Sequence, residues 1–458
     1  MLMDCQTRYG TVRGRISDDG VVACYLGIPF GKIPGRWKRP QEPEPFSGVF
    51  DALHFGKVPF QGLHLKEMPH DRESPVPGDA QESERCLFLN IWAPVNAVCS
   101  AVMVFVPGGG FINGATCQPV YDGEALARLG IVLVTVCHRL GALGFLSHPL
   151  LADENGQSGN YALYDLLRAL DWIHENIGVF GGDPKNVTLF GQSSGEVAVQ
   201  VLLAAPQARG KFKRAILQSG RCLESGDLMD TRESALWKGT NFMQVMQAAT
   251  LEEMMALAPN DMAIELYRLR KATFGPSGNP NSTRTVSEQK NPGRLLYHVD
   301  GEAMPALLEE AALDGLIADV DMMVGSCSEE GGGLTGEIRS HSANCWCENQ
   351  CSLGRKPVYL YLFSRRLEDD PRGAFHGAEL PYLFGNLRKM HRSYKQQDEK
   401  LSEMMMRYWV NFARTGNPNG AGLPEWQPFE KRNKRRMRLD VRCAMESVSE
   451  VHGANLVR

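Results

Sequence analysis

The clearest candidate for chemistry is a Gly-Gln-Ser-Ser-Gly pentapeptide at residues 191–195, which fits the pattern Gly-x-Ser-x-Gly. It lies between an apolar run at 187–190 and an apolar stretch at 197–205. A nucleophile elbow requires this order of strand, sharp turn and helix, because the turn must lift a serine hydroxyl clear of its sheet while the glycines let the backbone fold tightly. A turn that merely ends a strand has much the same composition. The pentapeptide therefore favours Ser193 as a nucleophile and leaves a structural turn as the alternative.

A glycine-rich segment at 106–111 reads Val-Pro-Gly-Gly-Gly-Phe and follows another apolar run. Consecutive glycines leave backbone N–H groups unobstructed by side chains, which suits an oxyanion hole that donates hydrogen bonds to a developing negative charge. The alternative is a flexible strand-to-helix loop, which is less favoured because an elbow follows downstream. Ser194, directly after the proposed nucleophile, would contribute a further N–H.

The partners of such a serine are expected in the order acid, then histidine, each just beyond a later strand. Glu329 and Glu330 come after the apolar run 321–324, and His376 comes after the run 358–363. The histidine would take the serine proton and return it to the leaving group, while a carboxylate holds the imidazole in the useful tautomer. On position alone both glutamates qualify. Three other histidines lie in or beside apolar segments and are expected to be structural: His138, His148 and His174.

The elements that would position these residues are predicted from the alternation of short apolar, β-rich runs with helical patterns. That alternation is typical of an α/β fold, with a mostly parallel sheet covered by helices on both faces. In open sheets of this kind the chemistry lies beyond the carboxyl ends of the strands. The predicted strands are 102–106, 131–136, 187–190, 214–218, 321–324 and 358–363, and the predicted amphipathic helices are 164–173 and 404–413.

Composition excludes some classes of partner. The chain has 458 residues, of which 43% are hydrophobic and 22% charged, and its formal net charge is −4. No basic patch interleaved with aromatic residues occurs, the basic run at 431–436 is expected to be a solvated turn, and no stretch reaches the ~18 apolar residues of a membrane span. We therefore expect neither a nucleic-acid nor a membrane partner.

Twelve cysteines are scattered along the chain without the spacing of a small secreted scaffold. Free thiols in a reducing compartment are expected, and residues 1–6 do not read as a secretory signal, so a cytoplasmic location is predicted. One cluster could supply four nitrogen and sulfur ligands. Its spacing is not a common zinc pattern, and a thiol-rich surface loop is favoured over a metal site. The cluster consists of His341, Cys345, Cys347 and Cys351.

Three further motifs give the chain a resemblance to a known family. They are Cys-Leu-Phe-Leu-Asn-Ile-Trp at 86–92, Phe-Gly-Gly-Asp-Pro-Lys-Asn-Val-Thr-Leu-Phe at 180–190 and Gln-Ser-Gly at 218–220. With these motifs the chain resembles the type-B carboxylesterases, which include cholinesterases and para-nitrobenzyl esterases. The resemblance implies a single α/β-hydrolase domain over 1–458, with a mostly parallel central sheet, helices on both faces and a serine carboxylic-ester hydrolase activity.

The resemblance also assigns roles to residues of this sequence. It places the acid immediately before a glycine, which selects Glu330 over Glu329. It implies an acyl-enzyme route for small ester substrates, without a cofactor or a metal. The implied catalytic residues are Ser193, Glu330 and His376, and the implied oxyanion-hole residues are Gly109, Gly110 and Ser194.

Departures from the family pattern narrow the expected substrates. Gln192 stands where the family usually has glutamate, and no tryptophan occurs between Trp37 and Cys86, where choline-binding members have one. Recognition of quaternary ammonium is therefore not expected, because both a ring face and a neighbouring charge are missing. The usual disulfide partner of Cys86 is also missing, so this cysteine is expected to be a buried free thiol.

The family has a longer helical insertion between the positions of Glu330 and His376, so a reduced cap insertion is expected around 331–356. The segment 270–300 is rich in glycine, proline, serine and asparagine and is predicted as loop, so a reduced insertion is also expected around 221–300. A less covered site would accept small uncharged esters broadly, because fewer walls exclude alternatives. Two other functions stay open: a lipase or lactone-type hydrolase with the same triad, and a noncatalytic cholinesterase-like binding protein. The protein is expected to be a monomer or a weak homo-oligomer.

Overall fold

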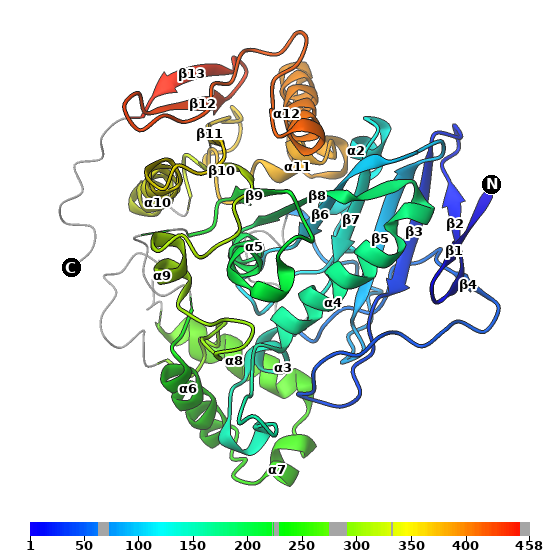
Figure 1. Ribbon diagram of the computed structural model, residues 1–458, viewed down its shortest axis with the longest axis vertical. Coiled ribbons are helices and arrows are strands. Elements are labelled where there is room, and N and C mark those ends of the chain that lie inside the picture. The colour runs from blue at the N-terminus through cyan, green and yellow to red at the C-terminus, as the bar shows by residue number, and fades with distance from the viewer. Residues whose placement is uncertain (63–72, 222, 224–228, 274–290, 331–332, 449–458) are drawn as a thin grey trace.

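The computed structural model describes residues 1–62, 73–221, 223, 229–273, 291–330 and 333–448, in which one large sheet carries helices on both faces (Figure 1). The strands are β1 (Leu2–Thr7), β2 (Gly10–Ile16), β3 (Val22–Pro29), β4 (Val49–Asp51), β5 (Phe88–Pro94), β6 (Ser100–Val106), β7 (Val132–Val136), β8 (Gly182–Gln192), β9 (Arg214–Gln218), β10 (Asp321–Cys327), β11 (Val358–Phe363), β12 (Arg435–Leu439) and β13 (Ala444–Ser447). The α-helices are α2 (Glu124–Arg128), α3 (Gly141–Phe145), α4 (Tyr161–Asn176), α5 (Ser194–Ala204), α6 (Arg232–Val245), α7 (Leu251–Ala256), α8 (Pro259–Thr273), α9 (Leu308–Leu313), α10 (Gly333–Ser352), α11 (Leu380–Leu383) and α12 (Gln396–Thr415).

The centre of the sheet is parallel and its two edges are antiparallel. The order is β1-β2-β3-β5-β7-β6-β8-β9-β10-β11-β12-β13, with β4 paired to β2. Neighbours from β7 through β12 run parallel, whereas β1, β2, β3 and β5 form the antiparallel edge on one side and β13 the other. Because the carboxyl ends of the parallel strands meet at one edge, side chains that follow β6, β8, β10 and β11 are brought together.

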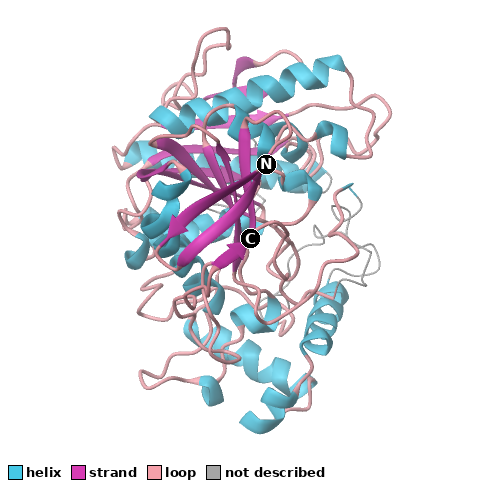
Figure 2. Cartoon of the chain, turned by 90° about the vertical axis from the view of Figure 1, so that its right-hand side faces the viewer, coloured by secondary structure: helices cyan, strands magenta, loops and turns pink. Residues whose placement is uncertain are grey.

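Two hydrophobic cores lie on opposite faces of the sheet, and strand β6 contributes to both. Val102, Val104 and Val106 belong to one core, while Met103 and Phe105 belong to the other. This division follows from the period of two along a strand, and it explains why the run is apolar throughout. Helices α4, α5, α9 and α10 cover the first face and α2, α11 and α12 cover the second (Figure 1), and the turned view in Figure 2 shows helices on either side of the twisted strands.

All six strands predicted from the sequence are confirmed, as β6, β7, β8, β9, β10 and β11. The two predicted amphipathic helices are confirmed as parts of α4 and α12. The parallel arrangement of these strands, with helices on both faces, is the α/β architecture expected from the alternating pattern.

The interpretation of the cysteine cluster as a surface loop is wrong, because these residues lie on helix α10. Cys347 is fully buried with Trp346 in the core on one face of the sheet, and the indole N–H of Trp346 lies 3.3 Å from the sulfur of Met322. His341 and Cys345 are one helical turn apart, with Nε2 and Sγ separated by 3.4 Å. In the described part of the chain no group of three or more His, Cys, Asp or Glu side chains is arranged to hold a metal ion.

The described part of the segment 221–300 carries three helices, α6, α7 and α8, which lie beyond the sheet at the bottom of Figure 1. The prediction of a loop over 270–300 is wrong for its first residues, because α8 continues to Thr273; residues 274–290 lie outside the described residues, and 291–300 form an irregular segment. A helix was not expected here because the nearby glycines and prolines dominate the pattern. Among the described residues, none of the helices has the length and hydropathy needed to cross a bilayer.

Candidate active site

The pentapeptide at 191–195 forms a sharp turn between strand β8, which ends at Gln192, and helix α5, which begins at Ser194. Ser193 stands between them with φ 59° and ψ −124°, a region that residues with side chains rarely adopt. Its backbone is held on both sides: the N–H of Ser193 donates to the carbonyl of Gln218 at 2.9 Å, and its own carbonyl accepts from Val197 at 3.3 Å. The turn therefore keeps a strained, half-buried serine at the carboxyl end of a central strand.

The two glycines of the pentapeptide are required by close approaches of the backbone. A Cβ atom at Gly191 would lie 2.3 Å from the carbonyl oxygen of Gly195. A Cβ atom at Gly195 would lie 2.1 Å from the carbonyl oxygen of Val106, on the neighbouring strand. Neither position has room for a side chain without a shift of the backbone, so the Gly-x-Ser-x-Gly segment is a tightly packed strand-to-helix turn and not a flexible one.

The glycine-rich loop after β6 lies directly beside the elbow. A Cβ atom at Gly108 would lie 3.0 Å from the Cβ of Ser193, and the N–H of Phe111 donates to the hydroxyl oxygen of Ser194 at 3.3 Å. Gly109 and Gly110 have positive φ values of 129° and 63°. The sequence-predicted glycines and the predicted nucleophile are thus neighbours in space.

Arg270 of helix α8 fixes this loop from the outside, because its guanidinium donates to the carbonyl oxygen of Gly110. A Cβ atom at Gly110 would lie 2.8 Å from the same guanidinium. Burial lowers the pKa of Arg270 to about 10, so the side chain stays cationic at neutral pH. Sequence reasoning missed this contact, since α8 lies far from the loop along the chain.

His376 and Glu330 are brought together although they follow different strands. The imidazole Nδ1 of His376 lies 2.7 Å from Oε2 of Glu330, and the N–H of Cys327 donates to Oε1 of the same carboxylate at 2.8 Å. Because a carboxylate accepts at Nδ1, that nitrogen carries the proton and Nε2 presents a lone pair. Glu330 is fully buried; burial opposes its ionisation, but Arg339 and His376 together hold the pKa of Glu330 below its ordinary value.

The structure separates the two glutamates that the sequence left equivalent. Glu330 points to the imidazole, whereas Glu329 pairs with the exposed Arg366 at the surface. Nε2 of His376 lies 3.4 Å from the amide nitrogen of Gln192, the residue directly before Ser193. The unprotonated ring nitrogen is therefore at the elbow, on the side of the candidate nucleophile.

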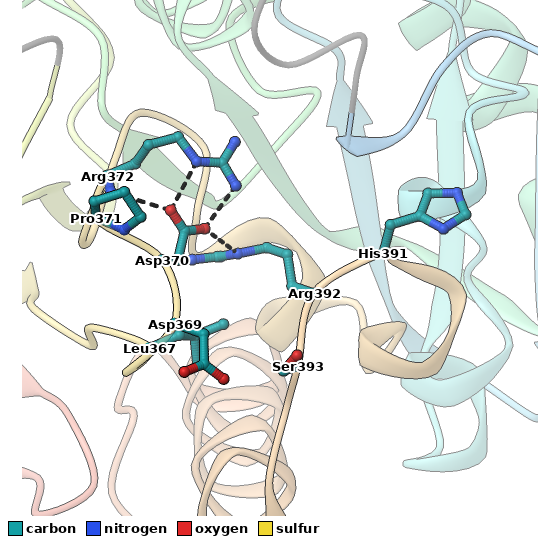
Figure 3. A pocket seen from close by; sticks show the side chains of 8 residues that line it. All are labelled: Leu367, Asp369, Asp370, Pro371, Arg372, His391, Arg392 and Ser393. Carbon is teal, nitrogen blue, oxygen red and sulfur yellow. Dashed lines mark hydrogen bonds and ion pairs between the residues drawn. The ribbon is translucent and has the colours of Figure 1, made fainter.

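A charged cluster supports the loop that carries His376, and this cluster was not found from the sequence. Two guanidinium groups pack over the ring of Phe375: that of Arg372 lies 4.5 Å and that of Arg392 lies 4.8 Å from the ring centroid. Figure 3 shows that both arginines donate hydrogen bonds to the carboxylate of Asp370, and the bond from Arg392 is 2.9 Å long. These residues line a cavity of about 320 Å³. Arg372 also pairs with Glu73 at 2.7 Å, so the residue before His376 is held by contacts from separate segments.

A second buried carboxylate lies behind the site. Glu379 is fully buried, accepts a hydrogen bond from the thiol of Cys327 at 2.8 Å and lies 3.4 Å from the hydroxyl of Ser219. Burial raises the pKa of Glu379 from 4.5 to about 7. The group is therefore largely protonated in mildly acidic solution when the protein is folded.

This shift predicts a stability that falls as the pH rises. Between about pH 4.5 and pH 7 the unfolded chain releases the Glu379 proton while the folded protein retains it, so the free energy of unfolding decreases by up to about 3 kcal/mol across that window. Replacement of Glu379 by glutamine removes this loss, and denaturant unfolding at several pH values should then give a flatter dependence than in the wild type. Equal slopes in the two proteins would contradict the assignment.

Three histidines of the described chain were expected to be structural. Nδ1 of buried His138 lies 2.9 Å from the carbonyl oxygen of Arg139, and the side chain of His148 accepts from the N–H of Leu150 at the start of a short 3₁₀ turn. Their predicted structural roles are confirmed. His174 lies exposed on α4, so the expectation of a structural contact in an apolar setting is wrong for it.

Comparisons with known proteins identify the family of the chain. The family model described as "Carboxylesterase family" matches residues 3–345 and 341–452. The chain is 31% identical to the para-nitrobenzyl esterase of Bacillus subtilis (strain 168), over 97% of this chain and 96% of that protein. It is 30% identical to the fumonisin B1 esterase of Sphingopyxis macrogoltabida, over 93% of this chain and 85% of that protein.

Solved structures give the same result. A PNB esterase structure superposes with a TM-score of 0.83 at 28% identity, covering 100% of this chain and 99% of that chain. A thermophilic PNB esterase superposes with a TM-score of 0.81, also at 28% identity, over 98% of each chain. The chain therefore belongs to the carboxylesterase family, has the α/β-hydrolase fold and is an enzyme that hydrolyses carboxylic esters.

Proposed function

We propose that this carboxylesterase acts on small uncharged esters through Ser193, Glu330 and His376, with an acyl-enzyme intermediate. The observation that carries the proposal is the hydrogen bond between Glu330 and Nδ1 of His376, which leaves Nε2 as a base at the elbow beside Ser193. A serine is a weak nucleophile unless a neighbouring base accepts its proton. The carboxylate orients that base and stabilises its charged form.

The reaction proceeds in two halves. The Oγ atom of Ser193 attacks the ester carbonyl while His376 Nε2 accepts its proton, and the carbonyl π electrons move onto the oxygen. Collapse of this tetrahedral oxyanion breaks the bond to the alkoxy group, which leaves as an alcohol with the proton from His376. Water then gives a proton to His376 and attacks the acyl group; Ser193 regains a proton as the carboxylic acid departs.

The backbone N–H groups of Gly109, Gly110 and Ser194 are proposed to bind the oxyanion. Two contacts support this assignment: the loop lies against Ser193 at Gly108, and Phe111 binds the hydroxyl of Ser194. Arg270 holds the loop at the carbonyl of Gly110. Preorganised donors of this kind are worth roughly 10²–10³ in kcat each.

Turnover of para-nitrophenyl esters of increasing chain length tests the substrate class. We expect hydrolysis of the acetate and butyrate and weak activity on long acyl chains, because a small uncharged ester needs no deep acyl pocket. A preference for the long chains would replace this assignment with that of a lipase. No turnover of any chain length, with Ser193 intact, would contradict the proposed mechanism.

Gln192 is expected to set part of the pH dependence. Its amide lies 3.4 Å from Nε2 of His376, so glutamate at this position would place an anion beside the imidazolium and favour its protonated form. The Gln192→Glu variant should show the acidic limb of its kcat/KM profile raised by about one pH unit. The same change at the exposed Gln244 should leave the profile in place. Superimposed profiles of Gln192→Glu and wild type would contradict this role.

Domain organisation and location complete the proposal. We propose one α/β-hydrolase domain over 1–458, with reduced insertions around 221–300 and 331–356, that acts in the cytoplasm as a monomer or weak homo-oligomer. All eleven cysteines in the described residues are free thiols, including the buried Cys86, which supports a reducing compartment.

A further inference from the structure

Helix α10 places a cation against the acid of the proposed triad. Nε of Arg339 lies 3.0 Å from Oε2 of Glu330, and Nη1 of Arg339 donates to the backbone carbonyl of Ser219. The arginine side chain is 17% exposed and the glutamate side chain is fully buried, so solvent screens this pair weakly. Neither composition nor spacing singled out Arg339, which lies in the segment 331–356 where a reduced cap insertion was expected.

The guanidinium and the imidazole share one carboxylate oxygen. Oε2 of Glu330 accepts from Nδ1 of His376 at 2.7 Å and is also the atom nearest to Arg339. The Nε–H of Arg339 makes no hydrogen bond within the described residues, so its effect on Glu330 at this contact is that of a charge. The permanent positive charge of Arg339 beside this oxygen offsets part of the negative charge of Glu330. A protonated His376 is therefore stabilised less than it would be by Glu330 alone.

We propose that Arg339 is a positioning residue for ester hydrolysis, which acts through Glu330 to keep His376 a neutral base at more acidic pH than the Glu330–His376 pair alone would allow. The inference rests on the proposed function, since it needs His376 as the base. Arg339 keeps Glu330 ionised in its buried setting and at the same time weakens the stabilisation of the imidazolium. Its removal should therefore move the acidic limb of the activity profile upward.

Other titratable groups face this pair from neighbouring elements. Glu379 precedes α11, Cys327 lies on β10 and Tyr361 lies on β11, and each of them interacts electrostatically with Glu330. Glu196 on α5 interacts with Tyr361. Burial raises the pKa of Cys327 and of Tyr361 well above their ordinary values, so both stay neutral. Burial raises the pKa of Glu379 to about 7, so its charge changes within the pH range of the test and the test includes a variant that lacks this carboxylate.

The test compares the pH dependence of kcat/KM for para-nitrophenyl acetate, read at the isosbestic wavelength of the product. Arg339→Gln keeps an amide near the Ser219 carbonyl but removes the charge, Arg339→Met keeps the aliphatic stem, and Arg339→Lys keeps the charge. The two charge-free variants should raise the acidic limb by about one pH unit, and the lysine variant should restore it toward the wild type. The shift should persist when Arg339→Gln is combined with Glu379→Gln.

Arg366 supplies a matched control. It pairs with Glu329, next to Glu330, but its side chain is 70% exposed, so Arg366→Gln removes the same charge from a solvated position. This variant should leave the acidic limb unchanged, because surface ion pairs are screened.

Several outcomes would overturn the role of Arg339. These are an unshifted profile in Arg339→Gln and Arg339→Met, an equal shift in Arg339→Lys, or failure of both charge-free variants to fold, which would assign the side chain to stability. The proposed function is tested separately with the wild-type enzyme. If the wild type hydrolyses the ester but the pH profile of Arg339→Gln is unchanged, only the role of Arg339 is contradicted. If the wild type does not hydrolyse the ester, the proposed mechanism itself is contradicted.

Discussion

Replacement of Ser193 by alanine is expected to lower kcat for para-nitrophenyl acetate by at least about 10⁴-fold while the protein stays folded. The change removes the only atom proposed to bond to the acyl group. It leaves the backbone of the elbow intact, because alanine keeps the Cβ that already occupies the strained position at φ 59°. Initial rates give the loss of activity, and thermal unfolding checks the fold.

The adjacent serine is a matched control for this prediction. Ser194 is proposed to contribute its backbone N–H, and within the described residues its hydroxyl accepts only from the N–H of Phe111. Ser194→Ala should therefore lower kcat by no more than about tenfold, since one loop contact is lost and the proposed oxyanion donor remains. Activity retained in Ser193→Ala, or lost equally in both variants, would contradict the assignment of the nucleophile.

Replacement of Glu330 by glutamine is expected to lower kcat by about 10⁴-fold. A side-chain amide can donate to Nδ1 of His376, which moves the imidazole proton to Nε2 and leaves no lone pair toward Ser193. The neighbouring Arg339 would also lose the charge that it faces at 3.0 Å. Steady-state kinetics across the pH range measure the effect, with denaturant unfolding to report any loss of stability.

Glu329 provides the comparison, because both glutamates fit the position predicted from the sequence. Its carboxylate pairs with an arginine that is 70% exposed, so Glu329→Gln should change kcat by less than about threefold. If the two variants were equally impaired, or if Glu330→Gln retained wild-type activity, the histidine would not depend on Glu330.

Much of the fold and of the site could be predicted from local patterns. Each central strand is buried on both faces, so it appears in the sequence as a continuous apolar run, as residues 102–106 of β6 do. The elbow and the glycine-rich loop were predictable for a related reason: close backbone approaches at Gly191 and Gly195 admit no side chain. Such steric demands leave a short signature in the sequence.

Helix α10 had no comparable signature. Among its described residues, Trp346 and Cys347 face the core, and most of the others are polar. The sequence therefore lacks the regular spacing of apolar residues that would predict a helix. Its packing against the sheet decides its structure, and tertiary contacts override weak local preference. The cysteines therefore suggested a surface loop, and the contact between Arg339 and Glu330 was not predicted.

The supports of His376 could not be predicted because they come from separate segments. Phe375 is held by Arg372 from its own loop and by Arg392 from beyond α11, and Arg372 also pairs with Glu73 near the other end of the chain. From the sequence alone, a charged residue at each of these positions is expected to be exposed to solvent, because the contacts between them form only in the folded chain.

Covalent labelling with a fluorophosphonate, followed by peptide mapping, tests the central claim most directly. The reagent requires a serine activated by a neighbouring base, which is the role proposed for Ser193 with His376. We expect one adduct per chain, on Ser193, that is slowed by a short ester, retained in Ser194→Ala and absent from Ser193→Ala. An active wild-type enzyme that is labelled at another residue, or not labelled at all, would contradict the account.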